Sequence, residues 1–413
     1  MESDIIPQPS LEPIERVKGA DLVVGILNPS GDDGFEAAAT VREAVERFAP
    51  PLRAVLVVND GAGGTRFDDE HSVPVLFCKL SNASAQEASA PGRFDAYPEL
   101  FSMSARIGAR ACGVISSESH ALSAEGINRL VRPALEMQFD LVAPRYARGK
   151  WEGLINRSIL SPITRALYGK RVQNPIGPDF ALSDKMMAWI LADHVAARRA
   201  NPSHPPPPIV SAAVRSGFQI CEAEVGERKQ PAADGVNVST LLAQFLGPVF
   251  LDMDRNAATW QRMRGSQAVP VFEKPEGVPT ETGAVDVKGL IDSYQLGVRN
   301  LHDIWSLALP PTILLEVRKL AALPQQQFRM PDELWVKIVW DFALAHRIRT
   351  INRDHLLRSF TPLYLGWIAS YALEMETAGP AAVDARMERL ARAYEADKPY
   401  LMSRWRWPDR FNP

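Results

Sequence analysis

The chain of 413 residues is long enough for roughly two or three folded units, and its 46% hydrophobic content is sufficient to build a core in each. Its 46 basic and 49 acidic residues leave a formal net charge of −3, which argues against a nucleic-acid binder that depends on bulk positive charge. Three separated cysteines without a C-x-x-C motif indicate neither a disulfide framework nor a zinc ribbon. We therefore expect a cytoplasmic globular protein with small-molecule or protein partners and no nucleic acid.

Residues 1–20 combine acidic residues and prolines where a signal peptide would have a basic stretch and an apolar run. No other window is long and apolar enough to predict a membrane span. We expect these residues to form a flexible lead into the first domain.

An alternation of apolar strands and amphipathic helices begins at Asp21 and predicts a parallel α/β sheet. Residues 21–27 form an uninterrupted apolar run, which is typical of a strand buried on both faces. A helical spacing of apolar residues follows over 35–48, and a second buried strand over 53–58 closes on Asn59-Asp60-Gly61. Strand, helix and strand in this order indicate a right-handed parallel crossover.

Two more strands are predicted further along the chain. A helix over 97–108 leads to a third buried strand over 111–115. Ser123 is expected to cap the next helix, over 126–137, and residues 139–146 predict a fourth strand.

Polar residues follow three of these strands. Because ligands of open parallel sheets bind beyond the carboxyl ends of the strands, we expect the loops at Asn28, Asn59 and Ser116 to face one crevice. A carboxylate at Asp60 could there accept hydrogen bonds from a base or a ribose.

Composition divides the chain into a lead (1–20), an α/β domain (21–265), a linker (266–284) rich in Pro and Gly, and a helical domain (285–413). The proline run over 201–208 is expected to be a rigid surface connector. The helices predicted for the last domain cover 290–307, 313–322, 331–348, 355–376 and 381–395.

Several charged side chains are candidates for binding a phosphate or a metal ion. Glu118 and His120 are weak metal candidates, because a hard divalent cation prefers several oxygen ligands. Arg93, after Gly92, could bring a guanidinium group to a phosphate, or be an ordinary surface arginine. Arg148 and Lys150 place cations after the fourth strand, and a solvated basic turn is an equal alternative.

The segment Asn174-Pro175-Ile176-Gly177-Pro178-Asp179-Phe180 surrounds one acidic residue with two prolines and a glycine. A stiff loop of this kind suits a positioned catalytic group. An ordinary turn between a helix and a strand is the alternative.

Two sequence blocks resemble a known family. YGKRVQNPIGPDF (168–180) and TPLYLG (361–366), within a likeness that spans residues 21–405, resemble bacterial family-2-like GT-A glycosyltransferases of the glucosylglycerate and mannosylglycerate synthase group. The resemblance implies a GT-A α/β domain with a mostly parallel sheet and a C-terminal helical domain. It also implies transfer of a hexose from a nucleoside-diphosphate sugar to a small acceptor such as glycerate, with retained anomeric configuration, Mg²⁺ or Mn²⁺, and a homodimer through the C-terminal helices.

The resemblance assigns site residues by position. Those implied for the nucleotide sugar are Gly25, Ile26, Leu27, Asn28, Asn59, Asp60, Gly61, Gly92, Arg93, Ser116 and Ser117. Those implied for the sugar and acceptor pocket are Tyr146, Asn174, Pro175, Ile176, Gly177 and Pro178. We expect the residues that take part in catalysis to be Asp179, Glu118, Arg148 and Lys150.

The chain departs from the family pattern at its metal site. Ser116-Ser117-Glu118 replaces the D-x-D motif, Gln230 replaces a histidine, and Trp367 replaces an arginine. One hypothesis is therefore an active transferase with little or no metal dependence, in which arginine and lysine side chains neutralise the leaving diphosphate. The alternative hypothesis is an inactive descendant that retains the fold as a nucleotide-binding or regulatory partner.

Overall fold

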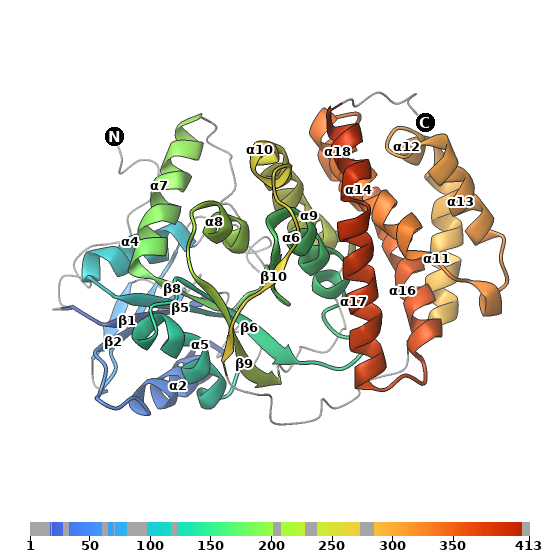
Figure 1. Cartoon of the computed structure of the whole chain (residues 1–413). Coiled ribbons are helices and arrows are strands. Elements are labelled where there is room, and N and C mark those ends of the chain that lie inside the picture. The colour runs from blue at the N-terminus through green and yellow to red at the C-terminus, as the bar shows by residue number, and fades with distance from the viewer. Residues whose placement is uncertain are drawn as a thin grey trace. The chain divides into compact units, whose positions relative to one another are not determined.

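The computed structural model of the chain describes residues 17, 19–27, 33–59, 65–69, 71–80, 97–116, 122–200, 208–227, 238–272 and 285–406. The described residues form two compact units (Figure 1). The first unit takes its residues from 1–147, 174–234 and 269–279, and the second from 148–173, 235–268 and 280–413.

This division differs from the expected single α/β domain over 21–265, because residues 148–173 and 235–268 belong to the second unit. Contacts within that unit explain the placement of the first of these segments. The backbone oxygen of Ser158 accepts hydrogen bonds from the Trp335 indole (3.3 Å) and the Tyr394 hydroxyl (2.9 Å). The buried guanidinium group of Arg165 pairs with Glu388 (2.6 Å) and Glu395 (2.9 Å).

The first unit contains a mixed sheet that is mostly parallel. In the described part of the chain its order is β11-β9-β6-β8-β5-β1-β2-β4-β3. Its strands are β1 (Leu22–Leu27), β2 (Ala54–Asn59), β3 (Arg66–Asp68), β4 (Val75–Cys78), β5 (Ala111–Ser116), β6 (Leu141–Ala147), β8 (Phe180–Ser183), β9 (Ile220–Glu227) and β11 (Val271–Phe272). β3 and β8 run antiparallel to their neighbours, and the other pairs are parallel.

Helices cover both faces of this sheet. α2 (Asp33–Glu46) and α5 (Ala124–Glu136) lie on one face, and α4 (Tyr97–Ile107), α7 (Asp184–Ala200) and α8 (Ile209–Arg215) lie on the other (Figure 1). The expected cap of α5 is confirmed, because the Ser123 hydroxyl oxygen accepts from the backbone N–H of Gly126 at 3.1 Å. The predicted α/β fold with a mostly parallel sheet is therefore confirmed.

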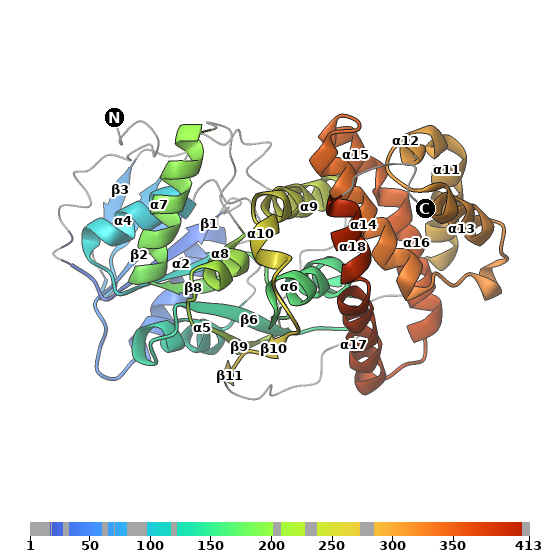
Figure 2. The ribbon, with the colours of Figure 1, turned by 45° about the horizontal axis from the view of Figure 1, so that its top comes forward.

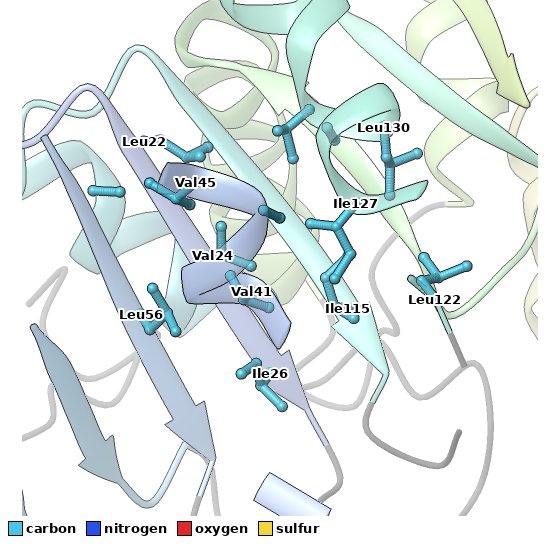
Figure 3. Packing of buried hydrophobic residues seen from close by; sticks show 14 of the residues in the cluster. Leu22, Val24, Ile26, Val41, Val45, Leu56, Ile115, Leu122, Ile127 and Leu130 are labelled. Carbon is cyan, nitrogen blue, oxygen red and sulfur yellow. The ribbon is translucent and has the colours of Figure 1, made fainter. Parts of the chain in front are cut away.

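The core beneath α2 and α5 follows from the two-residue period of a strand. Leu22, Val24 and Ile26 project from alternate positions of β1 toward the helices, where Val41 and Ile127 meet them (Figure 3). β1 is buried along its whole length, as its uninterrupted apolar sequence predicted. These contacts hold the central strands of the sheet against α2 and α5.

The second unit is largely helical, which confirms the predicted C-terminal helical region. Its helices are η1, a π-helix (Asn156–Leu160), α6 (Ser161–Tyr168), α9 (Val238–Arg255), α10 (Ala257–Trp260), α11 (Val287–Asn300), α12 (His302–Ser306), α13 (Pro311–Ala321), the 3-10 helix η2 (Gln325–Gln327), α14 (Asp332–Ile348), α15 (Arg353–Ser359), α16 (Thr361–Met375), α17 (Pro380–Ala396) and α18 (Lys398–Arg406). In the described ranges, no helix combines the length and apolarity that a membrane crossing requires.

Two helices predicted as continuous are interrupted. The segment 290–307 divides into α11 and α12, and 355–376 divides into α15 and α16. In the second case Pro362, in the first turn of α16, has no N–H to continue the hydrogen-bond ladder of α15.

The expected linker over 266–284 is wrong for its first part. Residues 267–268 form β10, which pairs with β7 (Lys170–Arg171), and residues 271–272 form β11, which pairs with β9. Strands of two residues are too short to show an alternating pattern, so the Pro and Gly content dominated the prediction. Residues 273–284 and 201–207 lie outside the described residues.

Close packing of α11 against α16 depends on Gly366. A Cβ atom at this position would lie 2.4 Å from Cδ2 of Tyr294, whose hydroxyl is held by the backbone oxygen of Val317 at 2.8 Å. We therefore expect Gly366→Ala to lower the free energy of unfolding by about 1–3 kcal/mol, despite the better helix propensity of alanine.

Gly247→Ala in α9 is the matched control, because its Cβ would lie at an ordinary 3.4 Å from Leu357. Calorimetric melting should show the control unchanged or stabilised by up to about 1 kcal/mol. A Gly366→Ala protein as stable as the control would show that the helix pair separates without cost.

Candidate functional site

The carboxyl ends of β1, β2 and β5 meet at one edge of the sheet. Leu27 pairs with Ser116 and Ile26 with Val58, in parallel register, so the three strands end side by side as expected. Gly25 and Ile26, assigned to a nucleotide-binding loop, instead lie within β1, and Ile26 is in the core. A Cβ atom at Gly25 would lie 2.2 Å from Leu100, so this glycine serves the packing of α4 on the sheet.

A buried carboxylate joins this edge to the neighbouring strands. Asp179, directly before β8, is 1% exposed. Its Oδ1 accepts from the backbone N–H of Ser116 at 2.8 Å, and its Oδ2 accepts from the Tyr146 hydroxyl. Ser116 is the last residue of β5 and Tyr146 belongs to β6. One side chain therefore fixes the ends of two strands in relation to the start of a third.

The charge of Asp179 affects the pKa of the neighbouring Tyr97. Tyr97, at the start of α4, is buried against Phe180, with ring centroids 5.2 Å apart in an edge arrangement. Burial raises the pKa of Tyr97 well above its usual value, and the negative charge of Asp179 raises it further.

The segment before Asp179 is anchored to β6 as well. The Asn174 amide donates from Nδ2 to the backbone oxygen of Pro144 at 2.9 Å, and Asn174 and Ile176 are buried. A small pocket beside this segment is also lined by Ile209 and Val210. This pocket has room for a water molecule.

The predicted cations Arg148 and Lys150 lie in the second unit, where local contacts hold them. Lys150 donates from Nζ to the backbone oxygen of Glu376 (2.8 Å), and its own backbone oxygen accepts from the Tyr371 hydroxyl (3.0 Å). A cation at the end of α16 compensates the unpaired carbonyl groups there. The guanidinium group of Arg148 lies against Gly153, where a Cβ atom would be 1.9 Å from its nitrogen. Their expected catalytic role stays a prediction.

Many predicted site residues lie outside the described residues, so their roles stay predictions. They are Asn28, Asp60, Gly61, Gly92, Arg93, Ser117, Glu118, His120 and Gln230.

The expected metal candidates Glu118 and His120 lie outside the described residues. Among the described side chains, no group of three His, Cys, Asp or Glu residues is placed to hold a metal ion. Asp179, the carboxylate next to the expected metal motif, directs both oxygens to protein donors.

The sequence did not predict the link between Asp179, Ser116 and Tyr146. A backbone N–H donor such as that of Ser116 has no residue-type signature, and the Tyr146 hydroxyl is 33 positions away from its acceptor. Trp335, Trp340, Trp367 and Tyr371 are all buried in the second unit.

No protein-family profile and no curated protein matches the sequence. Among solved structures, the chain is similar to glucosyl-3-phosphoglycerate synthase from Mycobacterium tuberculosis in complex with Mn²⁺, UDP-glucose and phosphoglyceric acid. The two sequences are 14% identical, the match covers 60% of this chain and 84% of that chain, and the TM-score is 0.36. It is also similar to mannosyl-3-phosphoglycerate synthase from Rubrobacter xylanophilus. The sequence identity is 13%, the match covers 64% of this chain and 83% of that chain, and the TM-score is 0.41.

Proposed function

We propose that the protein is a glycosyltransferase that moves a hexose from a nucleoside-diphosphate sugar to a small polar acceptor such as glycerate, with retention and with weak or no metal dependence. The observation that carries the proposal is the buried Asp179, which fixes the end of β5 at Ser116. In the family that the sequence resembles, the metal-binding acids follow this strand. The chain therefore retains a rigid support at the position where a donor diphosphate would dock.

We assign Asp179 a positioning role in this reaction. A nucleophile must reach the sugar carbon, whereas the Asp179 side chain is 1% exposed and hydrogen bonds to Ser116 and Tyr146 hold both of its oxygens inside the protein. Retention would then proceed by departure and attack on the same face of the sugar, without a covalent intermediate.

The charge of the leaving diphosphate needs compensation in the absence of a complete D-x-D motif. We assign this role to Arg93, Arg148 and Lys150. In this proposal Glu118 or His120 assists the transfer reaction. Guanidinium and ammonium groups stabilise a departing diphosphate electrostatically, as a metal ion would.

Thermal shift with UDP-, GDP- and ADP-glucose, each with and without Mn²⁺, tests the proposal. At a ligand concentration of about 100 times Kd we expect one of them to raise Tm by roughly 5 °C without metal. Sugar-nucleotide hydrolysis and transfer to glycerate should then be detectable, and Arg93→Ala should reduce both.

Arg358→Ala is the matched control, because Arg358 is an exposed arginine of α15 paired with Asp354 one turn away. It should leave binding and turnover unchanged. No stabilisation by any sugar nucleotide, together with no turnover, would reject the transferase and favour the inactive descendant.

A further inference from the structure

An exposed aromatic ring and a guanidinium group lie together at the outer part of the sheet. Phe35, in the first turn of α2, is 53% exposed, and its ring centroid lies 5.0 Å from that of Phe77 in β4. The guanidinium carbon of Arg66, in β3, lies 4.3 Å from the centroid of Phe77 and 5.4 Å from that of Phe35. The exposed Phe35 ring and the exposed Arg66 guanidinium group both pack on the buried ring of Phe77, and we call these two exposed side chains the Phe35–Arg66 platform.

The strand register places this platform at the carboxyl edge of the sheet. Arg66 is opposite Phe77, Phe77 pairs with Val58, Val58 with Ile26, and Ile26 with Ile115. This row lies one residue before the ends of β1, β2, β4 and β5, and β3 is its outer member (Figure 2). The platform and Ser116 therefore belong to the same edge of the first unit.

Two features distinguish the platform from the rest of the described surface: the exposure of the Phe35 ring, and an Arg66 guanidinium group that forms no ion pair with a described carboxylate. Phe35 is the one aromatic residue among the exposed large apolar side chains of the described chain. Arg66 is exposed and makes no ion pair with a described carboxylate, whereas the nearby Asp68 pairs with Arg42 at 3.3 Å. One face of its guanidinium group rests on Phe77, and exposure leaves the group open to a second flat partner.

We propose that the Phe35–Arg66 platform stacks the nucleobase of the sugar-nucleotide donor, an inference that rests on the proposed function. A base has two flat π faces, which stack on aromatic rings and on guanidinium planes. The platform offers both groups at the edge where the diphosphate would dock. Stacking is tolerant of base identity, so the platform supplies affinity for the nucleoside and leaves selection of the base to other groups.

Calorimetric titration of the full chain with UDP, ADP, GDP and inorganic pyrophosphate tests the platform. Phe35→Leu retains the apolar contact with Phe77 and removes the ring, and Arg66→Lys retains the charge and removes the plane. We expect each to weaken nucleoside-diphosphate binding about 10-fold, within the range for loss of one stacked base, with pyrophosphate binding unchanged. Leu315→Ala in α13 alters a side chain of similar exposure (52%) and should change neither nucleoside-diphosphate binding nor pyrophosphate binding.

The outcomes separate this inference from the proposed function. Nucleoside-diphosphate binding that is unchanged in both variants would reject the platform and leave the transferase proposal intact. Equal weakening for nucleoside diphosphates and pyrophosphate would also reject it, because the lost interaction would then be with phosphate. A wild-type protein that binds no nucleoside diphosphate would overturn both proposals.

Discussion

Replacing Arg386 with alanine is expected to lower the free energy of unfolding by about 3–5 kcal/mol. The Arg386 side chain is 4% exposed and makes two hydrogen bonds to Asp332, at 3.1 and 2.7 Å, and one to Glu374 at 2.6 Å. It thereby joins α17 to α14 and α16 in the second unit. Alanine would leave two carboxylates close together in a poorly solvated place without their common cation.

The loss of unfolding free energy caused by Arg386→Ala should increase from pH 4 to pH 7. Burial raises the pKa of Asp332 above its usual value, although Arg386 opposes the rise. Without Arg386 the pKa rises further, so protonation of Asp332 stabilises the folded variant below the unfolded pKa, and this contribution disappears as pH increases through the folded pKa. The deficit relative to wild type should therefore be largest near pH 7 and smaller near pH 4.

Arg392→Ala provides the matched control on the same helix. The Arg392 side chain is 72% exposed and pairs with Glu388 one turn away. A surface pair of this kind contributes at most about 0.5 kcal/mol. Melting curves of wild type and both variants at pH 4 and pH 7 compare the losses of unfolding free energy. Equal losses in the two variants, or a deficit from Arg386→Ala that does not change with pH, would contradict the expected role of the buried cation.

The central strands could be predicted from the sequence because they are covered on both faces. β1, β2 and β5 are continuous apolar runs, and such runs occur where helices pack on both sides of a strand. β8 could not be predicted in the same way. It has four residues, and it enters the sheet antiparallel between β5 and β6, a position that its own sequence does not encode.

The candidate site could be predicted by residue type but not by partner. Asp179 was singled out because a stiff loop surrounds it, yet its role depends on donors 63 and 33 positions away. Lys150 was expected at a phosphate, and its ammonium group is bound to the carbonyl end of α16. The attraction of a lysine to negative charge is the same in both cases, and only the fold determines which acceptor lies within reach.

Replacing Asp179 with alanine is expected to affect both stability and activity. The variant would bury the Ser116 N–H and the Tyr146 hydroxyl without their acceptor, at a cost of about 1–3 kcal/mol each. Release of the end of β5 should also lower kcat at least ~100-fold, because small displacements of a positioned group have effects of this size. Tyr146→Phe, which removes one of the two hydrogen bonds, should show an intermediate loss of stability.

Asp179→Asn distinguishes positioning from nucleophilic catalysis. The amide has nearly the shape of the carboxylate, its oxygen can accept from Ser116, and its nitrogen can donate to the Tyr146 oxygen once that hydroxyl rotates. A positioning role therefore predicts a Tm close to wild type and a kcat within about 10-fold, with KM for the sugar nucleotide little changed. Because an amide cannot replace a carboxylate nucleophile, a stable Asp179→Asn protein with no turnover would instead identify Asp179 as the attacking group.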